Sequence, residues 1–227
     1  SLPNNEMGFI IMEDNKGKVW FHTESGLCVY QPYRRNFKKI NFKKPGEESF
    51  PITSFFQDSH GLIWMSVPGD NLYVLDTVKN SFAVYASVWP EFPNKILSIV
   101  EDKYNGYYWL NTENGLAVYD TKKREYYHQN NNPGGLKCFF SSAIFSRPDF
   151  IYKDNNDILW IHKKINGAGS VINRFDIRNN ELITVQNKGN AFGSFFTDAS
   201  GTTWAYGNRL ARYDKKENRF IEIPKKR

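Results

Sequence analysis

The chain has 227 residues, of which 40% are hydrophobic and 16% are aromatic. This composition supports a folded, β-rich protein with a large core, because Phe and Tyr suit pleated, half-buried surfaces. No apolar stretch approaches the roughly 18 to 20 residues that span a bilayer, and no charged segment followed by an apolar one begins the chain. We therefore expect neither a membrane anchor nor a secretion signal within these residues.

An aspartate followed by a tryptophan recurs along the chain at nearly constant spacing. The five pairs are Asp14 and Trp20, Asp58 and Trp64, Asp102 and Trp109, Asp154 and Trp160, and Asp198 and Trp204. The aspartates lie 44, 44, 52 and 44 residues apart, and a period of roughly 40 to 50 residues in a β-rich chain is typical of propeller blades. We interpret these ten residues as the structural repeat.

Each repeat predicts four short strands. An apolar run precedes the Asp, a polar turn follows, and a second apolar run contains the Trp. Gly17, Gly61, Gly106 and Gly201 stand in these turns, where glycine adopts a positive φ without strain. The third strand ends on an aromatic residue or Leu, and seven residues later the fourth strand carries a large apolar side chain: Phe37, Phe82, Tyr126, Leu182 and Phe220.

The repeats predict an all-β fold, a β-propeller of four-stranded antiparallel blades. Radial stacking of such sheets hides most of their edges. We expect one domain over residues 1–227, with blades at about 6–42, 50–86, 95–129, 147–186 and 191–223.

Basic residues exceed acidic ones by 30 to 24, which gives a net charge of +6 and admits acidic partners. They occur as scattered pairs, such as Arg34–Arg35 and Lys215–Lys216, mostly where turns and outer strands are expected. Charge at such edges protects against sheet-to-sheet aggregation. We therefore expect a solvated edge and no nucleic-acid partner; a functional surface for polyanions is the alternative.

The repeats differ mainly in two kinds of connection. The spacing from Asp to Trp is nearly constant, whereas the step from Trp to the end of the third strand takes 10, 11, 10, 15 and 9 residues. Connections between blades also vary, and the longest runs through 129–145. In a four-stranded meander these two variable connections emerge on the same side. Variable loops on a rigid scaffold carry recognition, so we expect ligands on this side, which we call the variable face.

Trp89 is the only tryptophan outside the repeat position, in a loop stiffened by Pro90 and Pro93. A rigid, exposed indole would stack on a ligand ring. Alternatively, Trp89 and Phe92 fill a gap between the second and third blades.

A second group of candidates lies two residues after each repeat tryptophan. The residues are His22, Ser66, Asn111, His162 and Tyr206. They could ring the variable face, or satisfy the backbone of a neighbouring blade. With nearby donors added, the predicted ligand-binding residues are Trp89, His22, Asn111, Arg147, His162, Lys163, Asn166, Tyr206 and Arg209.

Catalytic signatures are missing from the sequence, which has no Gly-x-Ser-x-Gly elbow, Walker loop or dinucleotide fingerprint. Glu47 and Glu48 are adjacent in a loop rich in Lys, which does not supply the opposed carboxylates of glycoside hydrolysis. His22 and His162 occupy equivalent positions but lack metal-ligand spacing. We expect no catalytic residue, no metal and no cofactor.

Cys28 and Cys138 fall at unrelated positions of the repeat, one in a third strand and one in a connection between blades. A designed disulfide would join related positions, so we expect two unpaired thiols.

The segment TDASGTTW at 197–204 approaches the sialidase Asp-box, but an extra residue separates Asp198 from Gly201, and the first strands lack the arginines of a sialidase site. The whole repeat resembles the two-component regulator propeller repeat more closely. Its matching residues in the first and third repeats are Asp14, Gly17, Trp20, Thr23, Gly26, Leu27 and Tyr30, and Asp102, Gly106, Trp109, Thr112, Gly115, Leu116, Tyr119 and Asp120. The resemblance covers essentially the whole chain and is weakest in the fourth repeat, where Asp157 replaces the turn glycine.

This resemblance implies part of the extracytoplasmic, periplasmic sensor region of a Bacteroides-type hybrid two-component system with a histidine kinase and a response regulator. Such regions detect oligosaccharides and switch on polysaccharide-utilisation genes. They usually contain rings of about seven blades and a downstream β-sandwich, so the five blades would belong to a larger ring in a receptor, with a receptor homodimer as an option. The kinase would lie elsewhere, which leaves this segment without enzymatic activity.

The implied ligand is an oligosaccharide, and the positive net charge favours an acidic one such as a uronate or a sulfated chain. Two other classes stay open. One is a propeller scaffold for protein–protein interaction with no small-molecule ligand; the other is a propeller glycosidase or lyase.

Overall fold

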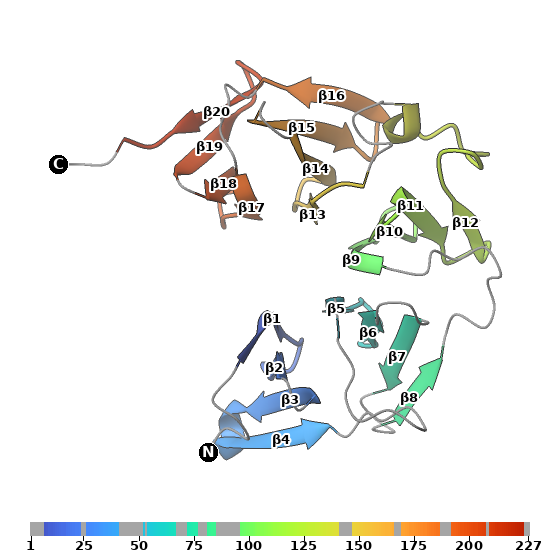
Figure 1. The fold of residues 1–227 in the computed structure, drawn as a ribbon, viewed down its shortest axis with the longest axis vertical. Helices are drawn as coiled ribbons and strands as arrows, with labels where there is room; N and C mark the ends of the chain where they lie inside the picture. Colours follow the sequence, from blue (N-terminus) through green and yellow to red (C-terminus); the bar gives the residue numbers. More distant parts are fainter. Residues whose placement is uncertain are drawn as a thin grey trace. The chain divides into compact units, whose positions relative to one another are not determined.

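A computed structural model describes residues 7–23, 26–40, 52, 54–66, 72–76, 81–84, 96–140, 147–165, 169–186, 192–207 and 209–224. The strands in these ranges form five four-stranded antiparallel sheets (Figure 1). Within each sheet the strands pair in chain order, which is the meander of a propeller blade. The predicted all-β architecture of five such sheets is confirmed.

The strand bounds follow the repeats. The first blade consists of β1 (Met7–Glu13), β2 (Val19–Thr23), β3 (Gly26–Gln31) and β4 (Asn36–Ile40). The second consists of β5 (Ser54–Gln57), β6 (Ile63–Ser66), β7 (Leu72–Asp76) and β8 (Ser81–Val84). The third consists of β9 (Ile96–Asp102), β10 (Tyr107–Thr112), β11 (Gly115–Asp120) and β12 (Glu125–Tyr127).

The remaining two blades complete the described chain. The fourth consists of β13 (Phe150–Lys153), β14 (Ile158–Ile165), β15 (Gly169–Asp176) and β16 (Glu181–Val185). The fifth consists of β17 (Phe192–Thr197), β18 (Thr203–Gly207), β19 (Leu210–Asp214) and β20 (Arg219–Glu222). Short 3₁₀ turns lie at η1 (Pro32–Arg34) and η3 (Lys137–Phe140). Within the described ranges no helix has the length and hydrophobicity needed to cross a membrane.

The chain divides into two compact units, Ser1–Ile99 and Val100–Arg227. The division falls within β9, so the third blade contributes to both units. That residues 1–227 form a single domain with the expected blade limits stays a prediction.

The repeat aspartate closes the turn between the first two strands of a blade. One oxygen of Asp14 accepts hydrogen bonds from the backbone N–H groups of Lys16 and Lys18, both at 2.9 Å. The other oxygen accepts the indole N–H of Trp20 at 2.8 Å. A single buried carboxylate therefore fixes both the turn and the orientation of the tryptophan, and charge-assisted bonds of this kind are the stronger ones.

The same arrangement recurs in three further blades. The indole N–H groups of Trp64, Trp160 and Trp204 donate to the aspartate six residues earlier at 2.7, 3.0 and 2.7 Å. The turn residue beside each carboxylate has a positive φ, as expected for the glycines. In the fourth blade Asp157 takes this conformation with φ of 58°, which aspartate tolerates better than most residues.

The third blade departs from this arrangement because one extra residue separates Asp102 from Trp109. The side-chain amide of Asn105 donates to Asp102 at 2.9 Å and takes the position of the indole N–H. Trp109 is fully buried, and its N–H has no hydrogen-bond partner among the described residues. Its ring instead packs edge-on against Phe175 of the fourth blade, with centroids 5.5 Å apart.

The hydrophobic core lies between successive blades rather than within one sheet. In the first unit, Trp20 and Val29 of the first blade share a buried cluster with Phe55 and Met65 of the second. In the second unit, one buried cluster joins the third and fourth blades, and another joins the fourth and fifth. Cys28 and Cys138 are both buried, and no disulfide joins them.

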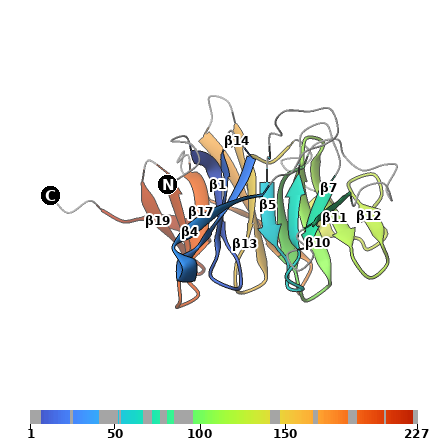
Figure 2. The same ribbon diagram turned by 90° about the horizontal axis from the view of Figure 1, so that it is seen from below.

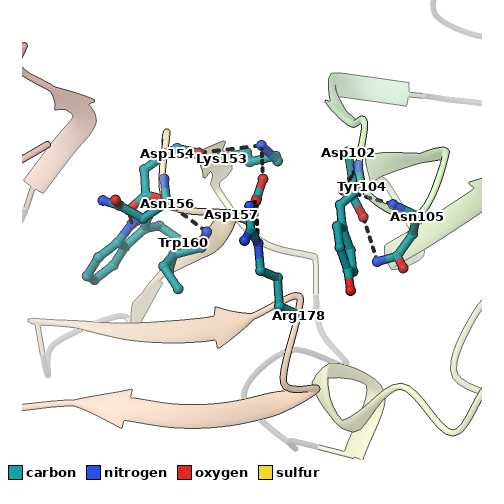
Figure 3. A network of polar contacts seen from close by, with 10 residues as sticks. Asp102, Tyr104, Asn105, Lys153, Asp154, Asn156, Asp157, Trp160 and Arg178 are labelled. Atoms are coloured by element: carbon teal, nitrogen blue, oxygen red, sulfur yellow. Dashed lines mark hydrogen bonds and ion pairs between the residues drawn. The ribbon is translucent and has the colours of Figure 1, made fainter.

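Polar contacts add to this packing where the turns of the third and fourth blades meet (Figure 3). Asp157 accepts a hydrogen bond from Arg178 at 2.7 Å and pairs with Lys153 at 2.8 Å. The Arg178 guanidinium lies 5.3 Å from the ring centroid of Tyr104 in the third blade. Burial opposes ionisation of Asp157, but the bonds from the two cations outweigh it and hold its pKa below the ordinary value. The aspartate at the glycine position thus helps to join two blades.

We predict that replacing Trp160 by Phe destabilises the protein more than replacing Trp109 by Phe. Both substitutions remove a similar volume from a buried site, but only the first removes a hydrogen bond to a buried carboxylate. A hydrogen bond to a charged group contributes about 1.5 to 3 kcal/mol, so the two free energies of unfolding should differ by about that amount in urea titrations. Equal losses would show that the indole bond contributes nothing.

Candidate functional site

The variable face of the fourth blade is built on an unusually long hairpin. β14 and β15 have eight residues each, whereas the corresponding strands of the other blades have four to six. Pairing continues without a break as far as Ile165 and Gly169. Figure 2 shows β14 along its length. Residues 163–165 of β14 extend past the last pair with β13, and residues 169–171 of β15 extend past the last pair with β16.

Four of the predicted ligand-binding residues meet at the base of this hairpin. The side-chain amide of Asn111 donates to the carbonyl of Pro148 at 3.2 Å. The Lys163 ammonium donates to the carbonyl of Arg147 at 3.3 Å. The carbonyl of His162 accepts the N–H of Asp149 at 2.9 Å. The segment that enters β13 therefore connects Asn111 of the third blade with His162 and Lys163 of the fourth.

Three cations lie on this part of the surface: Arg147 and Lys164 are exposed, and Lys163 is half-buried. We call Arg147, Lys163 and Lys164 the basic patch. Asp149 stands among them and accepts the backbone N–H of Lys164. One carboxylate among three cations leaves the patch positively charged.

The polar residues two positions after each repeat tryptophan do not share one role. Ser66 donates to the carbonyl of Ile96 at 2.8 Å, and Asn111 donates to Pro148, so both bond the backbone near the first strand of the following blade. His22 is half-buried, in the first unit. Tyr206 is 47% exposed. Ser66 and Asn111 fit the interpretation that such residues tie neighbouring blades.

His162 is a buried ring in apolar surroundings. Its imidazole stacks on Phe150 with centroids 4.5 Å apart and 20° between the planes, and Phe195 lies edge-on at 6.3 Å. Neither ring nitrogen has a hydrogen-bond partner among the described residues. Burial lowers the pKa of His162 to about 4; Asp149 acts in the opposite direction, and Lys164 lowers the pKa further. The side chain is therefore neutral at pH 7 and packs the base of the hairpin.

Tyr206 and Arg209 lie together in the fifth blade, on a cavity of about 620 Å³. Arg209 forms an ion pair with Glu222 across the cavity wall. Leu210 and Ile223 are 41% and 42% exposed and supply apolar surface. An apolar cavity with a few charged groups matches the general character of ligand sites.

Trp89 and Asn166 lie outside the described residues, as do Glu47 and Glu48. Sequence reasoning missed Asp149 and Lys164, although both adjoin residues that it selected, and it missed Glu222 because an ion pair across two strands has no local signal. The described residues contain no group of three or more His, Cys, Asp or Glu side chains placed to hold a metal ion.

No family model and no curated protein matches the sequence. Solved structures do share its fold. One, described as the extracellular domain of the hybrid two-component system BT3049 from B. thetaiotaomicron, matches 100% of the chain with a TM-score of 0.72 and 18% identity. A second, described as the same kind of domain of BT4673 from that organism, matches 97% with a TM-score of 0.53 and 18% identity. A catalytically inactive virginiamycin B lyase from Staphylococcus aureus, solved with quinupristin, matches 99% with a TM-score of 0.68 and 18% identity.

The chain spans 29% of the BT3049 structure, 35% of the BT4673 structure and 72% of the lyase. At these identities the likeness establishes the fold, and the predicted β-propeller class is confirmed. Both receptor domains and an enzyme share it.

We predict that His162 makes stability depend on pH. Below pH 6.5 the unfolded chain protonates this imidazole, whereas the folded chain does so only near pH 4. The free energy of unfolding should therefore fall by roughly 2 kcal/mol as pH decreases from 6.5 to 4. Urea titrations at pH 7 and pH 4.5 would measure it.

The control is His162→Asn, which introduces the residue that the third blade has at this position. The variant should lose this part of the pH dependence. An identical pH response in the two proteins would contradict the buried, neutral state of His162.

Proposed function

We propose that the chain is a ligand-sensing segment from the extracytoplasmic region of a hybrid two-component receptor. The observation that carries this proposal is the structural match of the entire chain to the BT3049 extracellular domain. The repeat residues support it independently, because the pattern of Asp14, Gly17, Trp20 and Tyr30 resembles the two-component regulator propeller repeat. In this proposal the segment lies in the periplasm and has no enzymatic activity of its own.

The proposed ligand is an oligosaccharide that binds the variable face. The long hairpin of the fourth blade presents the basic patch there, and Tyr206 of the fifth blade presents an exposed ring. Aromatic faces stack on the apolar side of a pyranose, and Arg and Lys side chains bind carboxylate or sulfate groups. An acidic glycan, such as a uronate or a sulfated chain, therefore fits the patch better than a neutral one.

Signalling would follow from the way a bound ligand changes an equilibrium between receptor states. A ligand that contacts several blades favours the state in which those contacts are best, and its differential affinity sets the size of the effect. Further propeller blades, a downstream β-sandwich and a second copy of the receptor are the proposed partners that would transmit it.

A lyase is the second candidate function, because the virginiamycin B lyase structure matches 99% of the chain. His162 is buried and stacked on Phe150, so it is not placed to act as the general base of a lyase, which favours the sensor. Chromatography of an oligosaccharide or quinupristin after long incubation with the protein would decide between them, since a sensor segment returns the compound intact.

We predict that Arg147→Gln combined with Lys163→Gln weakens binding of acidic oligosaccharides at least about tenfold. Removing a charge-assisted contact costs about 1.5 to 3 kcal/mol, and 1.4 kcal/mol corresponds to a factor of ten. Calorimetry with oligogalacturonate and with a sulfated chondroitin oligosaccharide would measure the loss.

The matched control is Lys38→Gln with Lys39→Gln, which removes two exposed cations from the outer strand β4 and gives the same net charge. The control should bind like the unchanged protein. Equal losses of affinity in both double variants would show that overall charge, and not the basic patch, causes the effect. A complete sensor region that binds no oligosaccharide would contradict the carbohydrate proposal.

A further inference from the structure

One position of the repeat changes from an apolar residue to a cation part-way along the chain. The residue paired with the repeat tryptophan on the third strand is Val29, Val74 and Val118 in the first three blades. These valines are buried. In the fourth and fifth blades the same register position holds Arg174 and Arg212. The fourth blade thus places a guanidinium where the preceding blades place core.

Arg174 is half-buried and has few partners. Its side chain is 12% exposed, and its charged partner among the described residues is Asp176, 3.7 Å away. A guanidinium offers five N–H donors, and a buried charge is costly unless it is paired and hydrogen-bonded. One distant carboxylate leaves most of these donors available to another acceptor.

The guanidinium lines a cavity of about 420 Å³ between the fourth and fifth blades, inside the second unit. This volume lies within the range of about 300 to 1,000 Å³ that holds small ligands. The fifth blade contributes Thr202, Tyr213 and Lys215 to the lining. The cavity adjoins Asp154 and Asn156 at the start of β14, whereas the basic patch lies toward the other end of the same strand.

The carboxylates around the cavity are already engaged. Asp154 accepts hydrogen bonds from the backbone of Asn156 and Ile158, from the Trp160 indole, and from Thr203 at 3.1 Å. Asp176 accepts the backbone N–H of Asn179 at 3.1 Å. The two carboxylates and the two cations balance in formal charge. Because these donors occupy the carboxylate oxygens, the hydrogen-bonding capacity that remains for a ligand lies mainly on Arg174 and Lys215.

We propose that this cavity binds the carboxylate or sulfate group of a small polar molecule such as a sugar acid, with Arg174 as the principal contact. A guanidinium and a carboxylate or sulfate can form two parallel hydrogen bonds, which adds geometric selectivity to charge. Lys215 adds a second cationic donor, and the ring of Tyr213 lines the cavity beside it. This site is separate from the variable face and does not depend on the proposed sensor function.

The test is calorimetric titration of the protein with glucuronate, glucose 6-sulfate and inorganic sulfate, with glucose as the neutral comparison. The unchanged protein should bind the first two and not glucose. Arg174→Val should lower their affinity at least about tenfold, while the fold is retained because the first three blades carry Val at this position. If inorganic sulfate also binds, and Arg174→Val abolishes that binding, the site recognises the oxyanion and does not require the sugar.

The matched control is Arg212→Val, the same substitution at the same register position of the fifth blade, where the side chain is exposed. It should leave affinity unchanged. Lys215→Gln changes an exposed side chain and should weaken binding severalfold, which tests the site even if Arg174→Val fails to fold.

Equal affinity for glucose and glucuronate, no binding of any acid, or equal losses in Arg174→Val and Arg212→Val would overturn the proposal. The double variant Arg147→Gln with Lys163→Gln should bind glucuronate normally. The variable-face proposal and this one can therefore fail separately.

Discussion

The structure depends on a carboxylate that satisfies the backbone and an indole together. At each standard repeat, one oxygen of the aspartate holds the turn and the other holds the tryptophan, as at Asp14 and Trp20. Trp20 and Trp160 then pack into the cores between successive blades. The turn of the hairpin and the position of the tryptophan ring both depend on this one aspartate. The packing between blades therefore depends on the same residue.

The third and fourth blades depart from this arrangement. In the third blade the extra residue gives the carboxylate to Asn105 and leaves Trp109 to pack against Phe175. In the fourth blade Asp157 replaces a glycine and binds Arg178, while Arg174 replaces a valine and opens onto a cavity. The scaffold tolerates these changes because other contacts between the blades persist. The proposed glycan surface and the proposed oxyanion cavity both use the fourth blade.

Much of the fold could be predicted from the sequence because its causes are local. Turn glycines with a positive φ depend on neighbours a few residues away. The same holds for the pairing of the third and fourth strands, as between Tyr30 and Phe37, and for the repeat period that these features produce. The hydrogen bonds of Ser66 and Asn111 to the next blade, and the contact of Arg178 with Tyr104, join residues 30 to 74 positions apart and leave no local pattern. The aligned repeats show Arg174 where earlier blades have Val. Only the strand register shows that this position pairs with the repeat tryptophan.

The most direct test of this account is the NMR spectrum of the indole N–H groups, assigned with single Trp→Phe variants. If the repeat carboxylates accept the indole N–H groups, the protons of Trp20, Trp64, Trp160 and Trp204 resonate downfield, and the Trp109 proton resonates clearly upfield of them. A Trp109 signal that coincides with the other four, or four repeat indoles with the shifts of solvent-exposed tryptophan, would contradict it.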